Sequence, residues 1–317
     1  MTPPVAAAAF LEAAGWGNAR ILPLAGDASF RRYFRVERDG GRAVLMDAPP
    51  PHEDVGPFLA IARYLTGHGF RAPAILAEDR ATGLLLLEDL GDARMRETID
   101  DDAGAERPLY EAAIDLLIAL QQHPPADIPP YDLPVLHREA NLLTEWFCPA
   151  AGLVVDLPGY TAAWDRVLPE VDVAEVTVLR DYHAENIMLL DGGALGLLDF
   201  QDALAGHRAY DLVSLLQDAR RDVPETVESA MLARFKSATN PGPEFDAAYA
   251  ILGAQRNAKI VGIFTRLWQR DGKPRYLDFL PRVWGYLNRD LAHPALAPVA
   301  AWFDAHIPSD KRGTIQP

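Results

Sequence analysis

The chain has 317 residues and carries 45 Asp and Glu against 30 Lys and Arg, a formal net charge of −15. This length suits one large bilobal domain or two domains, and the 49% apolar content excludes a mainly disordered chain. The acidic balance argues against a nucleic-acid partner, because proteins that bind phosphate backbones carry excess positive charge. The single cysteine, Cys148, excludes an intrachain disulfide and fits a reducing compartment. We therefore expect a cytoplasmic protein with no membrane partner, since no run is apolar for long enough to span a bilayer.

Alternating or apolar runs separated by turn residues predict a β-rich region in the first ninety residues. The expected strands are Ile21–Leu24, Tyr33–Glu37, Arg42–Asp47, Ala74–Glu78 and Leu84–Glu88. Apolar residues at helical spacing predict one helix between the third and fourth strands, with Asp54 as its N-cap. This region is expected to form a five-stranded antiparallel sheet with one inserted helix.

The strand pattern stops at Asp89-Leu90-Gly91-Asp92, where we place a boundary between lobes 1–90 and 91–317. Apolar periodicity predicts a mostly helical second lobe, and the fold class is therefore α+β. The expected helices are 109–120, 137–147, 160–168, 210–219, 226–236, 245–270 and 276–288. A β-like segment interrupts them, with a strand over 176–179 and a hairpin whose strands, 187–190 and 195–198, flank an Asp-Gly-Gly turn.

Polar residues at the ends of this β-like segment are typical of phosphoryl-transfer chemistry. Asp181 and Asn186 lie in the loop before the hairpin, and Asp199 follows its returning strand. The hairpin is expected to bring Asn186 and Asp199 to the same end of the ribbon, where their oxygens suit a nucleotide-bound Mg²⁺. Asp181 on the adjacent loop could accept the proton of a substrate hydroxyl.

This pattern resembles that of the protein-kinase-like phosphotransferases. Its motifs are most similar to those of aminoglycoside phosphotransferases and other small-molecule kinases. The residues that carry this resemblance are Asp181-Tyr182-His183-Ala184-Glu185-Asn186, Asp199-Phe200 and the later Ala209-Tyr210-Asp211-Leu212. The resemblance implies a bilobal kinase-like fold, ATP and Mg²⁺ as cofactors, Asp181 as the catalytic base, and Asn186 and Asp199 as metal ligands. It also implies that the N-terminal lobe binds the nucleotide and that the C-terminal lobe carries the catalytic loop and substrate site.

Two further segments resemble the nucleotide-binding parts of that family. The loop residues Gly26, Asp27, Ala28, Ser29, Phe30, Arg31 and Arg32 correspond to the loop that covers the phosphates. Glu88, Asp89 and Leu90 correspond to the hinge whose main chain holds adenine. One position departs from the usual pattern, because Met46 stands where the family places a phosphate-binding lysine. We expect Arg31 or Arg32 to supply the missing charge.

A narrower resemblance is to the anomeric N-acetylmuramate/N-acetylglucosamine kinases of bacterial cell-wall recycling, which also carry this methionine. It rests on Gly26–Ser29, Leu45–Pro50, Arg180–Asn186 and Leu198–Ala203. It implies phosphorylation of the C1 hydroxyl of a small amino sugar by ATP. Expected sugar contacts are His183, Glu185, Gln201 and Asp202, with Arg208 or Arg220 answering the carboxylate of N-acetylmuramate.

Two alternatives remain open at this point. An aminoglycoside or amino-alcohol kinase suits the acidic charge, because such substrates are cations. A non-catalytic nucleotide-binding protein is suggested by Met46, although the intact Asp181, Asn186 and Asp199 argue against it. We further expect a monomer, and we expect Lys259 on the long helix to be solvated.

Overall fold

The computed structural model describes residues 1–24 and 31–315, which contacts divide into two compact units. The first unit comprises Met1–Glu106 and Ala184–Ala203, and the second comprises Arg107–His183 and the chain from Leu204 onward. These units differ from the expected lobes 1–90 and 91–317, because residues 91–106 and the hairpin make their contacts with the N-terminal unit. The assignment of nucleotide and substrate binding to separate lobes stays a prediction.

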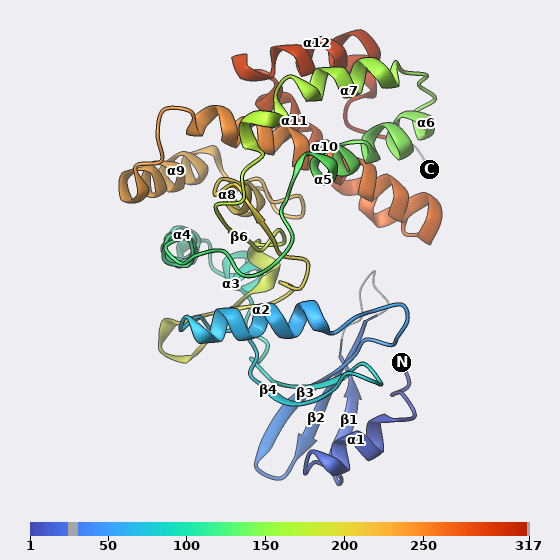
Figure 1. Ribbon diagram of the computed structural model, residues 1–317, viewed down its shortest axis with the longest axis vertical. Coiled ribbons are helices and arrows are strands. Elements are labelled where there is room, and N and C mark those ends of the chain that lie inside the picture. The colour runs from blue at the N-terminus through green and yellow to red at the C-terminus, as the bar shows by residue number, and fades with distance from the viewer. Residues whose placement is uncertain (25–30, 316–317) are drawn as a thin grey trace. The chain divides into compact units, whose positions relative to one another are not determined.

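The first unit is built on an antiparallel sheet of five strands in the order β1-β2-β3-β5-β4 (Figure 1). The strands are β1 (Arg20–Pro23), β2 (Arg32–Arg38), β3 (Gly41–Asp47), β4 (Ile75–Asp79) and β5 (Leu84–Glu88). The single helix between β3 and β4 is α2 (Gly56–Gly67). The predicted sheet is thus confirmed. The predicted cap of the helix is wrong by one residue, because Val55 is the N-cap and Asp54 instead accepts the Gly56 N–H at 2.8 Å.

The two faces of this sheet have different neighbours. Phe34 and Val36 on β2 face a core that also contains Leu11 of α1 (Ala7–Ala13) and Trp16. Because side chains alternate along a strand, Tyr33 and Arg35 point to the opposite face. The opposite face therefore carries Tyr33 and Arg35 and lies away from the α1 core.

The hairpin consists of β7 (Ile187–Leu189) and β8 (Leu195–Leu197), joined by the 3₁₀ turn Asp191–Gly193. It is fixed to the first unit at both strands. The Leu197 N–H donates to the Arg71 carbonyl at 2.8 Å, and the Leu189 N–H donates to the Ala93 carbonyl at 2.7 Å. The second contact lies next to α3 (Met95–Asp101), a helix that the sequence pattern did not indicate.

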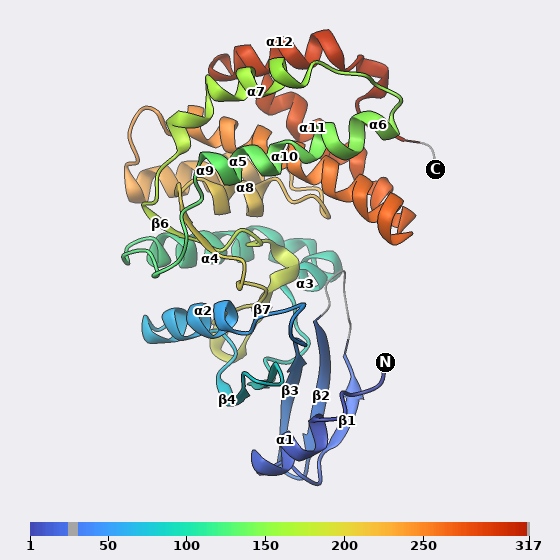
Figure 2. The same cartoon turned by 45° about the vertical axis from the view of Figure 1, so that its right-hand side comes forward.

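The second unit is mostly helical (Figure 2). Its α-helices are α4 (Glu106–Leu120), α5 (Leu133–Ala140), α6 (Cys148–Ala150), α7 (Leu157–Asp165), α8 (Tyr210–Leu216), α9 (Glu225–Thr239), α10 (Phe245–Asp271), α11 (Leu280–Leu291) and α12 (Ala297–His306). A small antiparallel pair, β6 (Val176–Val178) and β9 (Leu204–Gly206), lies among them. The helix expected over 137–147 starts earlier and is broken, because Asp132 caps α5 through the Val135 N–H and a π-helical turn follows over Leu143–Phe147.

The core of the second unit forms around α10, whose 27 residues run through it (Figure 1). α10 is buried along most of its length, so polar residues on it are buried as well. Gly262 gives room for a close crossing, since an added Cβ would lie 2.2 Å from the Leu142 carbonyl carbon. Helices α7 and α12 lie side by side, and the Tyr160 and Trp302 rings contact each other between them, with centroids 4.6 Å apart and planes tilted by 57°.

Candidate active site

The hairpin brings two of the predicted ligands together within the first unit. Asn186 ends a 3₁₀ turn directly before β7, and Asp199 lies two residues after β8. The Asn186 Nδ2 atom lies 3.5 Å from the Asp199 Oδ2 atom, as the hairpin pattern predicted. Asp199 has a left-handed backbone, with φ of 56°, and Gln201 Nε2 donates to its Oδ1 at 2.8 Å. Asp199 is therefore held in one orientation by its own turn.

This pair fits a magnesium ion that is shared with a nucleotide. Mg²⁺ takes one or two protein oxygens and fills its octahedron with phosphate oxygens and water. Asp199 is exposed, and a half-turn of the Asn186 amide would place its oxygen beside the Asp199 carboxylate. Within the described residues no cluster of three or more His, Cys, Asp or Glu could hold a metal without such outside ligands.

The sheet face opposite α1 carries a second polar group of the first unit. Met46 on β3 pairs with Tyr33 on β2, and both side chains lie on this face. Arg31 donates through Nε to Glu53 at 3.0 Å, with side-chain exposures of 14% and 13%. Burial lowers the pKa of Arg31, but Tyr33, Glu53 and Asp202 raise it by more. The net pKa lies above the usual value, so the guanidinium stays charged. Hence a charged arginine lies on the face where the usual lysine is missing.

Arg32 is directed to the other face of the sheet. It pairs across the strands with Asp47, and its Nε donates to that carboxylate at 2.8 Å. Its Nη1 also donates to the Thr2 carbonyl at 3.2 Å, on the side where α1 packs. Strand alternation therefore separates the two arginines that sequence reasoning left equivalent.

The other predicted nucleotide residues divide into described and undescribed positions. Gly26, Asp27, Ala28, Ser29 and Phe30 lie outside the described residues. The Glu88 side chain pairs with Arg71 at 2.7 Å and accepts the Ala74 N–H at 3.2 Å. Asp89 pairs with Arg35 at 2.8 Å and accepts the Gly91 N–H at 2.9 Å, while Leu90 is half-buried. The carboxylates thus shape the turn after β5, and the role of this segment in binding adenine stays a prediction.

The loop that carries Asp181 belongs to the second unit and is held by hydrogen bonds to the helices that pack against it. Arg180 has a left-handed φ of 70°, which costs a non-glycine residue energy. Asp211 compensates by accepting the Leu179 N–H at 2.7 Å and the Arg180 N–H at 2.9 Å. Ser214 Oγ donates to the Arg180 carbonyl at 2.9 Å and accepts from Arg256 Nη2 at 2.9 Å. Both sides of the strained residue are therefore fixed by α8 and α10.

Basic side chains surround Asp181 in this unit. Burial raises the pKa of its carboxyl, but His183, Lys259, Arg180 and Arg256 lower it below the usual value. Asp181 is thus ionised at neutral pH and able to accept a proton or hydrogen bond. The expectation that Lys259 is solvated is wrong, because it is 13% exposed and pairs with Glu139 at 2.9 Å.

Glu139, Arg180 and Lys259 form a charge network that sequence reasoning missed. Arg180 forms an ion pair with the same Glu139 carboxylate. Burial would raise the pKa of Glu139, but Lys259 and Arg180 lower it to about 2. Arg180 next to Asp181 in the sequence was the available signal, whereas Glu139 and Lys259 lie far from the motif.

The residues expected to contact sugar are placed differently from one another. His183 is buried, and its Nε2 lies 3.3 Å from Arg220 Nη1. Glu185 forms an ion pair with Arg96, and Gln201 donates to Asp199, so both have a partner inside the first unit. The exposed Asp202 acts electrostatically on Arg31. The Arg208 guanidinium donates to Glu175 at 3.0 and 2.8 Å, and its main-chain N–H donates to the same carboxylate at 3.0 Å, so the guanidinium is committed to Glu175.

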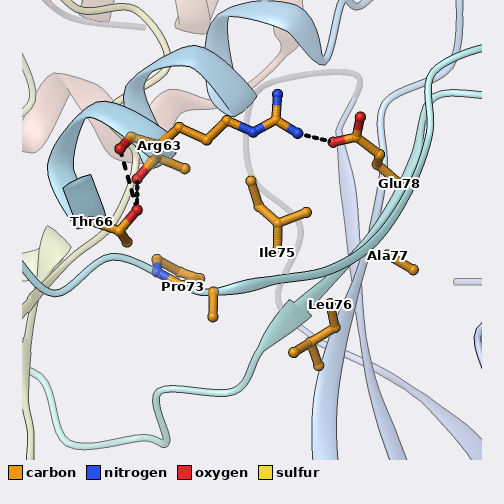
Figure 3. Close-up of a pocket in the computed structure, with 9 residues that line it drawn as sticks. Arg63, Thr66, Pro73, Ile75, Leu76, Ala77 and Glu78 are labelled. Atoms are coloured by element: carbon orange, nitrogen blue, oxygen red, sulfur yellow. Dashed lines mark hydrogen bonds and ion pairs between the residues drawn. The ribbon is translucent and has the colours of Figure 1, made fainter.

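Two surface hollows lie elsewhere in the units. One of about 470 Å³ lies between α2 and β4, where Arg63 bonds Glu78 at 2.6 Å (Figure 3). None of the predicted nucleotide, metal or sugar residues that the structure describes lines it. The other, of about 710 Å³, lies in the second unit and includes Arg208, His207 and Glu175 among its lining residues. Among the described helices, none is both long and apolar enough to span a membrane.

Comparison with known proteins shows the family of this chain. The model of the phosphotransferase enzyme family (APH) matches residues 20–250. An N-acetylmuramate/N-acetylglucosamine kinase from Caulobacter vibrioides is 40% identical, with 97% of each chain covered. A kinase of the same name from Pseudomonas aeruginosa is 43% identical, covering 90% of this chain and 89% of that protein. The crystal structure of a choline kinase from Streptococcus pneumoniae is similar in fold, with a TM-score of 0.63 at 13% identity, covering 92% of this chain and 97% of that chain.

Proposed function

Because the chain belongs to the phosphotransferase enzyme family, we propose that it transfers the γ-phosphoryl group of ATP to the anomeric hydroxyl of N-acetylmuramate or N-acetylglucosamine. The observation that carries this proposal is the pinned loop at Arg180, which presents an ionised Asp181. The choice of acceptor rests on the relatives, which cover most of the chain at 40% and 43% identity.

In the proposed reaction Asp181 is the base. The C1 hydroxyl of the sugar loses its proton to the Asp181 carboxylate as its oxygen bonds to the γ-phosphorus. The bond from that phosphorus to the bridging oxygen of ADP breaks, so the products are a sugar 1-phosphate and ADP. A C1 hydroxyl is more acidic than an ordinary sugar alcohol, which makes this proton transfer easier.

The remaining groups bind and orient the nucleotide. Asn186 and Asp199 would hold Mg²⁺, which would supply positive charge to neutralise the charge that develops on the phosphate group. Arg31, on the sheet face of Met46, would bind the phosphates in place of the usual lysine, together with the loop 26–30. The main chain at Glu88, Asp89 and Leu90 would hold adenine.

A panel of acceptors tests the function directly. Purified protein with ATP and Mg²⁺ is offered both amino sugars, an aminoglycoside and choline, and products are read by phosphorus NMR. We expect a sugar 1-phosphate signal and loss of reducing-end reactivity with the amino sugars. A product phosphorylated at C6, or turnover with the aminoglycoside or choline alone, contradicts the proposal. Absence of turnover with every acceptor favours a nucleotide-binding protein without catalysis.

Asp181→Asn tests the role of the base. Asn has the same size but cannot take the hydroxyl proton, so we expect the rate to fall by about 10²–10⁴-fold with ATP binding retained. The matched control is Asp246→Asn, an exposed residue that pairs with Lys236 at 2.8 Å on the surface of the second unit. Near-normal turnover of Asp181→Asn excludes this assignment.

Asp199→Ala tests the metal site. The change removes a charged oxygen ligand, so we expect the Mg²⁺ concentration for half-maximal rate to rise by about tenfold or more. Asp191→Ala is the control, since Asp191 lies in the exposed turn at the other end of the same hairpin. An unchanged magnesium dependence in Asp199→Ala contradicts the assignment.

A further inference from the structure

A short loop after α8 places a buried acid and an arginine next to the histidine of the catalytic loop. His183 follows Asp181 by two residues, and its Nε2 lies 3.3 Å from Arg220 Nη1. Asp218 is 1% exposed, and its Oδ1 accepts the Arg220 N–H at 2.8 Å. Its other oxygen, Oδ2, is buried and has no hydrogen-bond partner among the residues that the structure describes. A buried carboxylate oxygen without a donor is costly, which points to a donor supplied from outside the chain.

The flanks of this loop are fixed, so the acid and the arginine are held in place. Gln217 donates to Asp290 at 2.9 Å and accepts from Asn257 at 2.7 Å, and both partners are buried. On the other side Arg282 donates to the Ala219 carbonyl at 3.2 Å. These contacts come from α10 and α11, two long helices of the core. The packing of α10 and α11 therefore fixes the positions of Asp218 and Arg220 relative to His183.

The charges at this loop suit a polar acceptor that carries an anion. Burial lowers the pKa of His183, and Asp218, Arg220 and Asp181 are the charged groups that act on it most strongly. Because a neutral imidazole carries no charge, His183 does not offset the positive charge of the Arg220 guanidinium. A guanidinium has five N–H donors, so it can contact His183 and a carboxylate at once. Arg208, the other arginine expected for this role, is held by three bonds to Glu175.

We propose that Asp218 and Arg220 form the acceptor subsite beside Asp181, in which Asp218 Oδ2 accepts a hydrogen bond from the sugar and Arg220 binds the carboxylate of N-acetylmuramate. This inference rests on the proposed function. N-acetylmuramate differs from N-acetylglucosamine by a lactic acid ether on the same ring, so only it carries a carboxylate. Arg220 therefore sets the preference between the two sugars, whereas Asp218 serves both.

Arg220→Met tests the subsite through a ratio of two rates. We expect kcat/KM for N-acetylmuramate to fall by about 10- to 100-fold, the range of a lost charge-assisted hydrogen bond, while kcat/KM for N-acetylglucosamine changes little. Arg220→Lys keeps the charge and should restore part of the loss. The control is Arg208→Met, for which the ratio between the sugars should stay that of the wild type.

Asp218→Asn completes the test. We expect its KM to rise by about tenfold for both sugars and to stay unchanged for ATP. Because both sugars are measured on one preparation, a partly folded variant lowers both rates and leaves their ratio unaltered. An unchanged ratio in Arg220→Met, or unchanged sugar KM values in Asp218→Asn, overturns the subsite alone. Failure of the wild-type protein to phosphorylate either sugar overturns the proposed function and the subsite with it.

Discussion

Asp211→Asn tests whether the loop that presents Asp181 is held by Asp211. In the wild type each Asp211 oxygen accepts one main-chain N–H, from Leu179 at 2.7 Å and from Arg180 at 2.9 Å. An Asn side chain keeps one acceptor and turns an NH₂ group toward the other N–H. One bond to a charged group is worth about 1.5–3 kcal/mol, and a buried donor is left without a partner. We expect the free energy of unfolding to fall by about 2–3 kcal/mol.

The loss of activity should exceed what this loss of stability explains. Arg180 has a φ of 70°, and relaxing its backbone would displace Asp181, the next residue. A displacement of about 1 Å at a reacting group costs about 10²-fold in rate. We therefore expect a folded Asp211→Asn enzyme with kcat lowered by about that factor and little change in the KM for ATP.

The assay is urea unfolding and steady-state kinetics on the same preparations. Burial raises the pKa of Asp211 to about 7, so measurements belong at about pH 8, where the wild-type carboxyl is ionised. Asp246→Asn is the control, because an exposed ion pair contributes only about 0–1 kcal/mol. If Asp211→Asn unfolds and turns over like the wild type, the two hydrogen bonds do not hold the loop and the reasoning is refuted.

Two further predictions concern the core of the second unit. Gly262→Ala places a methyl group 2.2 Å from the Leu142 carbonyl carbon and should lower the free energy of unfolding by about 3 kcal/mol, measured in urea. Gly285→Ala on α11 meets no atom of the described residues within 4 Å and should instead raise the free energy of unfolding by up to about 1 kcal/mol; equal effects would contradict the close crossing. Burial raises the pKa of Asp290 to about 8 from an unfolded value near 3.8. The stability from its protonated form is complete below pH 3.8 and is lost as the pH rises through about 8. Asp290→Asn should therefore lose less stability than the wild type between about pH 6 and pH 9, and parallel pH curves would exclude this origin.

Local pattern was enough to predict the sheet and the proximity of Asn186 to Asp199. Alternation and turn residues depend on neighbours in the chain, so the strands from Arg20 to Glu88 were placed within about one residue. The hairpin turn lies between Asn186 and Asp199, and closing it brings their side chains to 3.5 Å. Element ends that depend on caps were less accurate, as at α5, where Asp132 starts the helix earlier than apolar spacing indicated.

Similarity in sequence determined the family, because the chemistry of phosphoryl transfer requires particular residue types at a short spacing. Asp181, Asn186 and Asp199 lie within nineteen consecutive residues, and the family model matches residues 20–250. The same reasoning could not choose between Arg31 and Arg32, which are adjacent in the chain. Pairing of β2 with β3 separates the two, because it directs Arg32 to Asp47, whereas Arg31 precedes β2 and interacts electrostatically with Tyr33 on the face of Met46.

Only tertiary structure decided which distant charges act together. Glu139, Lys259 and Arg256 are far from the motif in sequence, yet packing of α5 and α10 places them around Arg180 and Asp181. In the same way, Glu175 binds the Arg208 guanidinium. Helices α10 and α11 hold the loop that directs Arg220 to His183. The physical reason is that a buried polar group without a partner raises the free energy of the folded state. Which groups pair depends on helices that meet only in the folded chain.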